Sequence, residues 1–460
     1  MNYSAYTIKE LKTSLKKKHF SSENVVRDCI QEIEDSKHLN AFITVCKDEA
    51  IENAKKADKK IKDGIDQPLL GIPISIKDIY LTRGIRTTAA SKVLDNYIPQ
   101  YSATVVEKLE EAGAIIIGKT NCDAWAHGSS GENSDYGPTE NDYLEGYVPG
   151  GSSSGSAVSV SADMAFVSMG TDTGGSIRLP ASFCNVVGLK PTYGRVSRYG
   201  IIAMASSLDS IGHFTRYVDE SALVLSITAG HDPKDATTPK KNVDDYESYL
   251  KKDIKGIKIG LPKEFFSNGL DTKIKEKIEK EVNSLESRGA KVEIISLPNT
   301  EYAIACYYII QPAEVSSNLA RYDGIRYAND RTHFTDEAKR RIMLGTYVLS
   351  SGYYDAYYKK AMQVRTLIKN DFDEAFKKVD VIITPVSPAM PWKIGEKVND
   401  PLAMYLSDIY TVTANLAGIP GLSVPIGLID GLPVGMQILG PHFSEGRLFQ
   451  IGQAVEDSGL

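Results

Sequence analysis

The stretch Gly150 to Pro191, GGSSSGSAVSVSADMAFVSMGTDTGGSIRLPASFCNVVGLKP, decides how the rest of the chain is interpreted. It contains two clusters of glycine and serine, at 150–155 and 174–176. The apolar run between them suits a small-residue helix followed by a short buried strand over 166–169. A flexible linker has no such periodicity. We therefore expect the serines to lie at the ends of regular elements.

The second cluster is suited to hold a negatively charged oxygen. Glycine allows positive φ and a close approach of a ligand to the backbone, so several N–H groups can point at one place. Such an arrangement forms an oxyanion hole. The four groups expected to form it belong to Thr173, Gly174, Gly175 and Ser176. One Ser-Gly cluster alone is more often a turn or a helix cap, but two clusters, the second flanked by Asp172 and Arg178, favour catalysis.

A serine nucleophile needs a base, and Lys77 is the candidate. The seven histidines form no metal-ligand pattern, whereas Lys77 ends the run Gly71-Ile-Pro-Ile-Ser-Ile-Lys77, whose apolar alternation predicts a buried strand. Such a lysine is ordinarily a snorkelling side chain or the ion-pair partner of Asp78. If its amine is desolvated, its pKa falls from about 10.4 toward neutrality, and it becomes a competent base.

These residues carry a resemblance to the amidase signature family. It rests on Lys77, Ser152 and Ser176, with GGSS from 150 and GTDTGGSIR from 170. The resemblance implies amide hydrolysis by a Ser-Ser-Lys triad, in which Ser176 attacks, Ser152 relays the proton and Lys77 is the base. It also implies an α/β fold, a single-domain α/β/α sandwich around a large twisted mixed β-sheet.

The region from Tyr307 to Arg365 resembles one branch of that family, the glutaminase subunits of tRNA-dependent amidotransferases. The resemblance implies that Arg341 holds the α-carboxylate of glutamine, that Asp408 holds its α-amino group and that Tyr307 or Tyr308 provides a third contact. A structural ion pair or a packed ring is the alternative for each. The segment from 327 to 340 is shorter than the branch usually has.

The loop NCDAWAHGSSGENS, residues 121–134, follows a predicted strand and is polar enough either to line a pocket or to be a solvated loop. By resemblance it lines the site, so Gly128 and Ser129 are expected to contact the substrate. Cys122 and His127 stand where the family usually carries methionine, which would alter the shape of the pocket.

The resemblance also implies partners. The chain has no Walker A loop, so an acceptor carboxylate would be activated elsewhere. We therefore expect a B subunit, which would carry the tRNA and ATP sites with Mg²⁺, together with a small C subunit. tRNA would be contacted mainly through the partner, and no cofactor or metal is expected in this chain. The choice between Gln-tRNA and Asn-tRNA would lie in the other subunits.

Composition is consistent with this interpretation. The chain has 460 residues, is 42% hydrophobic and carries a net charge of −6, which argues against direct nucleic-acid binding. Its five cysteines form no CxxC pair, and no stretch approaches 18 apolar residues. We expect a cytoplasmic protein without membrane contact, or one of an organellar matrix if a transit peptide was removed. The single domain 1–460 would comprise packing helices (1–65), a signature core (66–215) and the remainder (216–460).

Some elements are predicted directly from pattern. A helix opening at Ser102 separates the Lys77 strand from a second strand over 114–118, an order that predicts parallel strands. A helix is expected over 404–417, and strands over 422–429 and 434–439 are expected to form a hairpin about Asp430-Gly431.

Three other functions remain open. The chain could be a free-standing amidase of the same family acting on another amide. Residues 151–155 also match the G-x-S-x-G elbow of an α/β-hydrolase with Ser153 as nucleophile, although no adequate apolar strand precedes them. The third is an architectural subunit without activity, against which the intact set of Lys77, Ser152 and Ser176 argues.

Overall fold

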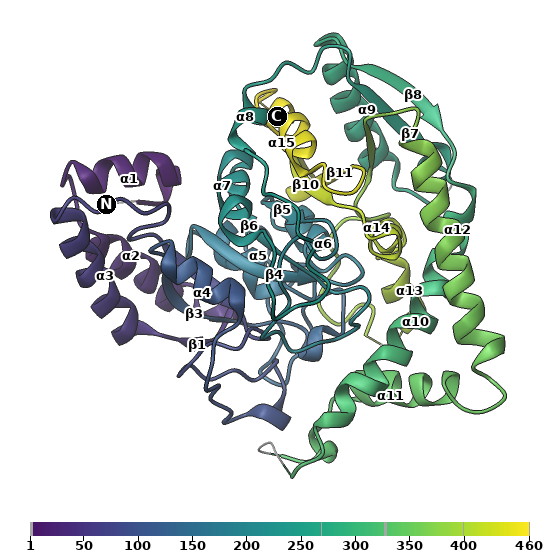
Figure 1. Cartoon of the computed structure of the whole chain (residues 1–460), viewed down its shortest axis with the longest axis horizontal. Coiled ribbons are helices and arrows are strands. Elements are labelled where there is room, and N and C mark those ends of the chain that lie inside the picture. Colours follow the sequence, from purple (N-terminus) through teal and green to yellow (C-terminus); the bar gives the residue numbers. More distant parts are fainter. Residues whose placement is uncertain (1–2, 268, 326–328, 399, 460) are drawn as a thin grey trace.

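The computed structural model describes residues 3–267, 269–325, 329–398 and 400–459. Its centre is a mixed eleven-stranded sheet in the order β1-β3-β2-β4-β6-β5-β10-β11-β9-β7-β8. Figure 1 shows that this sheet runs through the molecule, with strands from the first, middle and last parts of the chain. The predicted α/β/α sandwich around a large mixed sheet is confirmed.

The strands are β1 (Phe42–Val45), β2 (Pro73–Lys77), β3 (Ile115–Thr120), β4 (Val167–Asp172), β5 (Val187–Lys190), β6 (Ser210–Thr215), β7 (Lys258–Pro262), β8 (Lys291–Ile295), β9 (Val381–Pro385), β10 (Gly421–Ile429) and β11 (Leu432–Leu439). The helices are α1 (Ile8–Lys16), α2 (Ser22–Asp35), α3 (Lys47–Lys62), α4 (Thr104–Glu111), α5 (Ser154–Ser161), α6 (Arg178–Phe183), α7 (Val218–Thr228), α8 (Glu247–Leu250), α9 (Thr272–Ser287), α10 (Ala303–Asn318), α11 (Asp336–Val348), α12 (Lys360–Ala375), α13 (Pro401–Leu406), α14 (Val412–Ala417) and α15 (Glu445–Glu456).

Three neighbouring strands near one edge of the sheet, β3, β2 and β4, are parallel. β2 pairs in parallel with β3 on one side and with β4 on the other, and α4 makes the crossover between β2 and β3. All residues of these three strands are buried, as expected for a parallel sheet covered on both faces. The prediction of two parallel strands joined by a helix is therefore confirmed. Lys77 lies at the carboxyl end of β2.

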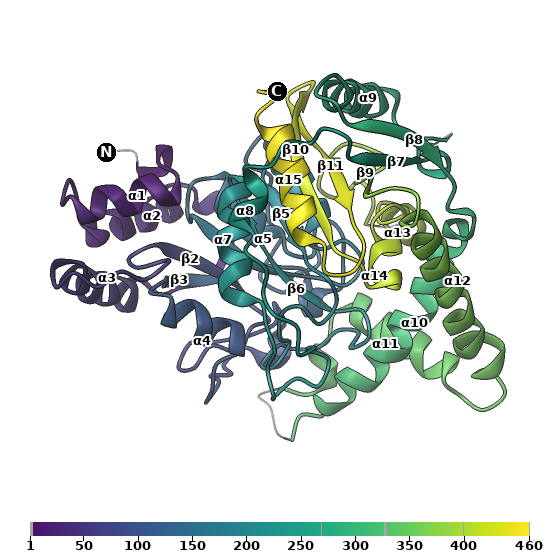
Figure 2. The ribbon, with the colours of Figure 1, turned by 45° about the horizontal axis from the view of Figure 1, so that its top comes forward.

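Two successive residues of β10 show that helices cover both faces of the sheet. A Cβ added to Gly421 would lie 3.1 Å from the Arg178 side chain of α6, so this position of β10 faces α6. The side chain of the next residue, Leu422, faces α15, since it lies 2.7 Å from where a Cβ on Gly452 of that helix would stand. Because successive strand residues point to opposite faces, α6 and α15 lie on opposite sides. Figure 2 shows α15 lying across β10 and β11.

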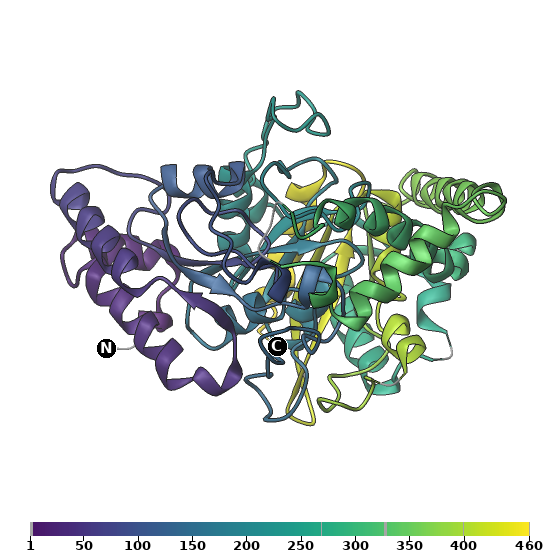
Figure 3. The same ribbon diagram turned by 90° about the horizontal axis from the view of Figure 1, so that it is seen from below.

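The helices α10, α11 and α12 form a separate layer at one end of the molecule. Figure 3 shows the N-terminal helices, in purple, at the other end. α10 packs against both α11 and α12, and a π-helical turn, Asp355–Lys359, leads into α12. A Cβ on Gly345 of α11 would overlap the carbonyl of Pro312 in α10, so the two backbones meet closely there. This layer carries Tyr307, Tyr308 and Arg341, three of the residues predicted to recognise glutamine.

The C-terminal hairpin is confirmed, but the continuous helix predicted over 404–417 is wrong. β10 and β11 pair antiparallel, with Ile429 opposite Leu432. By contrast, α13 ends at Leu406 and α14 begins at Val412. Ser407 Oγ donates to the carbonyl of Met404, and the N–H of Asp408 bonds to Tyr405, a tighter i to i−3 step. The resulting turn directs Asp408 toward the loop at Ser129.

Candidate active site

Lys77 lies at the centre of a buried hydroxyl cluster. It is wholly buried, and its Nζ donates to Ser152 Oγ at 2.8 Å, Ser153 Oγ at 2.9 Å and Thr171 Oγ1 at 3.0 Å. Burial lowers the pKa of the Lys77 amine from 10.5 to about 8, with nearby acidic groups opposing a larger fall. Its acceptors are neutral hydroxyls, which leaves the amine able to act as a base near neutral pH.

Asp78 is not the ion-pair partner of Lys77. Its carboxylate lies 3.3 Å from Nζ of Lys119 on the adjacent strand β3, in a pair whose side chains are both fully buried. The backbone N–H and hydroxyl of Thr88 also donate to it. Asp78 therefore pairs with Lys119 and accepts the hydrogen bonds of Thr88 in the following loop. Its carboxylate makes no direct contact with the Lys77 amine.

The two triad serines lie on neighbouring segments. The Gly151–Ser152 peptide bond is cis, and the N–H of Ser153 donates to the carbonyl of Ser176 at 3.2 Å. Ser152 Oγ accepts from Lys77, whereas the hydroxyl of Ser176 makes no hydrogen bond to another described residue. The structure thus brings Lys77 and Ser152 into direct contact and places Ser176 beside them, without a closed hydrogen bond between the two serine hydroxyls.

The loop that carries Ser176 is anchored by a buried ion pair. Asp172, the last residue of β4, binds Arg178 through both carboxylate oxygens, at 3.1 Å and 2.9 Å, and also accepts from the N–H groups of Ile177 and Arg178. Burial would raise the pKa of Asp172, but the Arg178 charge and hydrogen bonds outweigh it and lower the pKa to about 2. Both ends of the 173–176 loop are therefore fixed by one carboxylate.

The backbone of the predicted oxyanion loop packs closely against the side chains of Tyr307 and Thr411. A Cβ on Gly174 would come within 2.7 Å of the Tyr307 hydroxyl, and one on Gly175 within 2.3 Å of Thr411 Oγ1. Gly175 also has φ of +143°, which side-chain-bearing residues rarely adopt. Thr173 Oγ1 donates to Asp209 at 2.7 Å. Among the described residues we find no acceptor for the N–H groups of 173–176, so they are free to bind a ligand.

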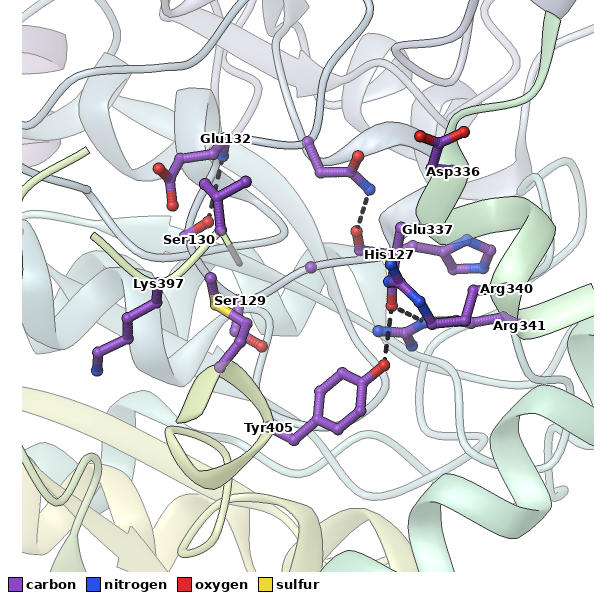
Figure 4. Close-up of a pocket in the computed structure, with 14 residues that line it drawn as sticks. His127, Ser129, Ser130, Glu132, Asp336, Glu337, Arg340, Arg341, Lys397 and Tyr405 are labelled. Carbon is purple, nitrogen blue, oxygen red and sulfur yellow. Dashed lines mark hydrogen bonds and ion pairs between the residues drawn. The ribbon is translucent and has the colours of Figure 1, made fainter. Parts of the chain in front are cut away.

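A pocket of about 440 Å³ lies between the 127–133 loop, α11 and the segment around α13. Figure 4 shows how these elements converge on it. Its lining is rich in charge: His127, Gly128, Ser129, Ser130, Glu132, Asn133, Asp336, Glu337, Arg340, Arg341, Lys397, Val398, Met404 and Tyr405. The lining includes the predicted contacts Gly128, Ser129 and Arg341 but neither triad serine.

Arg341 is held so that its terminal nitrogens remain free. Its Nε donates to Glu337 Oε1 at 2.7 Å, one helical turn earlier on α11. Its guanidinium carbon lies 5.6 Å from the ring centre of Tyr308 and 5.9 Å from that of Tyr405, and the two rings stack at 3.8 Å. Among the described residues no acceptor bonds the terminal nitrogens. A guanidinium in this state can take a carboxylate in a bidentate manner.

Asp408 lies near the hydroxyl of Tyr308, one of these two rings. Its Oδ2 accepts from Ser129 Oγ at 2.7 Å and lies 3.5 Å from the hydroxyl of Tyr308. Burial raises the pKa of Asp408 to about 7, although Ser129 and Arg341 oppose the rise. The two tyrosines proposed as alternatives have separate positions, since Tyr307 reaches the nucleophile loop and Tyr308 reaches Asp408.

The pocket wall is directly connected to the segment that carries Ser152. The N–H groups of Ser130 and Gly131 lie 3.0 Å and 2.8 Å from where a Cβ on Gly151 would stand, next to Ser152. Asp123 Oδ2 accepts from the N–H of Gly131 at 3.0 Å. Residues 129–131 therefore join the surroundings of Asp408 to the segment that carries Ser152.

Several site residues were not predicted. Ser153 and Thr171 share the Lys77 amine, Asp209 holds the nucleophile loop, and Glu337 and Tyr405 orient Arg341. Of these, Glu337 could have been found from its spacing of four residues from Arg341, typical of a helical ion pair. The others depend on contacts between distant segments. The short 327–340 segment begins outside the described residues, at 327 and 328.

The α/β-hydrolase alternative does not agree with the geometry. Ser153 is wholly buried at the start of α5, accepts from Lys77 and donates to the carbonyl of Thr171 at 3.1 Å. No histidine bonds it in the described part of the chain.

Within the same described ranges, no cluster of three or more His, Cys, Asp or Glu side chains could hold a metal ion. No helix in these ranges has both the length and the apolar character to cross a bilayer.

Comparison with known proteins shows the family to which the chain belongs. The family model described as Amidase matches residues 24–449, so the chain belongs to the amidase family and is an enzyme of that family. It is 54% identical to the A subunit of glutamyl-tRNA(Gln) amidotransferase from Thermoanaerobacter pseudethanolicus, in an alignment that covers 100% of this chain and 97% of that protein.

Solved structures share the whole fold. The crystal structure of the A subunit of glutamyl-tRNA(Gln) amidotransferase from Thermotoga maritima superimposes with a TM-score of 0.86 at 42% identity, covering 99% of this chain and 95% of that one. The peptide amidase of Stenotrophomonas maltophilia also gives a TM-score of 0.86, at 31% identity, with 99% and 97% covered.

Proposed function

We propose that this chain is the glutaminase subunit of a tRNA-dependent amidotransferase. It would hydrolyse the side-chain amide of glutamine and supply ammonia for converting Glu-tRNA(Gln) to Gln-tRNA(Gln), or Asp-tRNA(Asn) to Asn-tRNA(Asn). The observation that carries the proposal is a pair of ionisable groups of opposite sign: Arg341, which lines the pocket and has free terminal nitrogens, and Asp408, which accepts a hydrogen bond from the pocket residue Ser129. They match the α-carboxylate and α-ammonium of a free amino acid.

The hydrolysis begins with a proton transfer. In its neutral form Lys77 accepts the proton of Ser152, which in turn takes that of Ser176 as Ser176 Oγ attacks the amide carbon. The contact between Lys77 and Ser152 at 2.8 Å supports the first transfer. The second requires the Ser176 hydroxyl to turn toward Ser152 when substrate binds.

The negative charge that develops on the amide oxygen is stabilised by the backbone N–H groups of the 173–176 loop. Return of the proton through Ser152 to the amide nitrogen releases ammonia and leaves a γ-glutamyl ester on Ser176. Water, deprotonated by the same route, then attacks the ester carbon and releases glutamate. All atoms come from glutamine and water, and no cofactor takes part in this half of the reaction.

The acceptor half of the reaction is assigned to partners. The relatives are named as A subunits of an amidotransferase, which supports assembly into a complex of several subunits. In our proposal a B subunit binds the aminoacyl-tRNA and uses ATP with Mg²⁺, and a small C subunit or equivalent joins the two. We propose a cytoplasmic heterotrimer.

The test measures ammonia release from glutamine, asparagine, a peptide amide and an anilide. The chain is assayed alone and as the complex obtained by co-expression with its genomic neighbours. A preference for glutamine that increases on addition of Glu-tRNA would support the proposal. Equal or better hydrolysis of the peptide amide or the anilide, without response to partners or tRNA, would instead identify a free-standing amidase.

A further inference from the structure

His127 is a buried histidine whose ring has no hydrogen-bond partner in the described part of the chain. It follows the short helical turn Ala124–Ala126 and lines the pocket, yet its exposed fraction is 0%. Neither Nδ1 nor Nε2 bonds to any described residue. In Figure 4 the ring extends toward the helix that carries Arg340 and Arg341. A buried polar group left unpaired costs free energy, so an unpartnered imidazole at a pocket wall is suited to hydrogen-bond a ligand bound in that pocket.

The backbone of His127 is held by hydrogen bonds, whereas its ring makes none to a described residue. Its carbonyl accepts from Asn133 Nδ2 at 2.7 Å, and its N–H donates to the carbonyl of Ala124. The loop therefore holds the residue at the pocket independently of the side chain. A methionine in this place would fill the space without any strongly polar atom to satisfy, so packing alone does not explain an imidazole here.

The charge state of the ring determines which group it can bind. Burial, and then the neighbouring Arg341 charge, lower the pKa of His127 well below 6.5. The ring is therefore neutral at physiological pH and offers one N–H donor and one acceptor. His127 and Arg341 line the same pocket, so an anion bound there by the guanidinium can also accept from the imidazole N–H once the ring turns toward the cavity.

We propose that His127 is a substrate-binding residue that donates its imidazole N–H to the α-carboxylate of glutamine, sharing that carboxylate with Arg341. The proposal rests on the proposed glutaminase function and adds a determinant to it. Arg341 supplies the positive charge, and His127 supplies a second, directional hydrogen bond to the carboxylate. Together they favour a substrate that carries an α-carboxylate over a simple amide that lacks one.

The test compares two substrates that differ in this group alone. 4-Aminobutanamide is glutamine with the α-carboxylate replaced by hydrogen. In the complex with its partners, kcat and KM are measured for both substrates with wild type, His127→Met, His127→Gln and His38→Met, the last an exposed histidine that serves as a matched control.

His127→Met is expected to lower kcat/KM for glutamine about tenfold, mainly through KM, as for the loss of one hydrogen bond to a charged group. The change for 4-aminobutanamide should stay within twofold. His127→Gln, which keeps an N–H, should recover most of the loss. An equal loss for both substrates would reveal a structural role, and no loss would remove any role; both overturn the proposal. A wild type inactive on glutamine would overturn the proposed function as well.

Discussion

The Lys77 amine makes the pH dependence of catalysis the most informative prediction. A fall of the pKa from 10.5 to about 8 corresponds to roughly 3 kcal/mol against the charged form. The base must be neutral to accept a proton, so kcat should follow the neutral fraction of Lys77. With a pKa of about 8, that fraction rises roughly tenfold between pH 7 and pH 9 and then levels off.

An unperturbed lysine would behave differently. With a pKa near 10.4, the neutral fraction would rise about a hundredfold over the same two pH units and would not level off. The assay is ammonia release at saturating glutamine across pH 6.5–10, which removes contributions from substrate capture. Stability is followed in parallel by thermal unfolding, because a lysine whose pKa is depressed on folding weakens the fold as pH falls from the unfolded pKa toward about 8.

Lys77→Arg provides the matched control. A guanidinium keeps its proton at all these pH values, so the variant should lose at least about a hundredfold in kcat throughout. The reasoning would be refuted by a kcat that continues to climb tenfold per pH unit beyond pH 9. It would equally be refuted by a Lys77→Arg enzyme that retains most of its activity.

Three further predictions concern the predicted glutamine contacts and the anchor of the Ser176 loop. Arg341→Ala should raise the KM for glutamine about 10- to 100-fold, while Arg340→Ala, a half-exposed neighbour, should change it less than threefold; equal effects would contradict the clamp. Arg178→Met should lower the free energy of unfolding in urea by about 3–5 kcal/mol, because it strands the buried Asp172 carboxylate, and a loss below about 1 kcal/mol would show that the pair is dispensable. Asp408 has a pKa raised to about 7, so protonation should raise KM as pH falls below 7, and this dependence should vanish in Asp408→Asn; a persistent dependence would assign it to another group.

The sequence predicted the central sheet and the catalytic segments because those features are local. Each prediction depended on a few neighbouring residues: the apolar alternation before Lys77, the small-residue run after Ser152 and the Asp430-Gly431 turn. The continuous helix over 404–417 failed for a related reason. Its apolar spacing is helical throughout, but tertiary contact between Asp408 and Ser129, 279 residues apart, favours a turn that pattern alone does not reveal.

The electrostatics of the site also depend on long-range contacts. Whether Lys77 pairs with the adjacent Asp78 could not be decided from their order in the chain. The choice is made by Lys119 on β3, which reaches Asp78 only because β2 and β3 are neighbours in the sheet. Likewise, no local pattern in the sequence indicates that the ring of His127 has no hydrogen-bond partner within the described ranges.

Ammonia release from glutamine by the partner-bound complex, comparing wild type with Ser176→Ala and Ser153→Ala, tests the central claim most directly. The account predicts that Ser176→Ala abolishes release. Ser153→Ala, which removes one of three hydroxyl acceptors from Lys77, should retain a measurable rate. Full activity in Ser176→Ala, or its loss in Ser153→Ala alone, would contradict the assignment of Ser176 as the nucleophile.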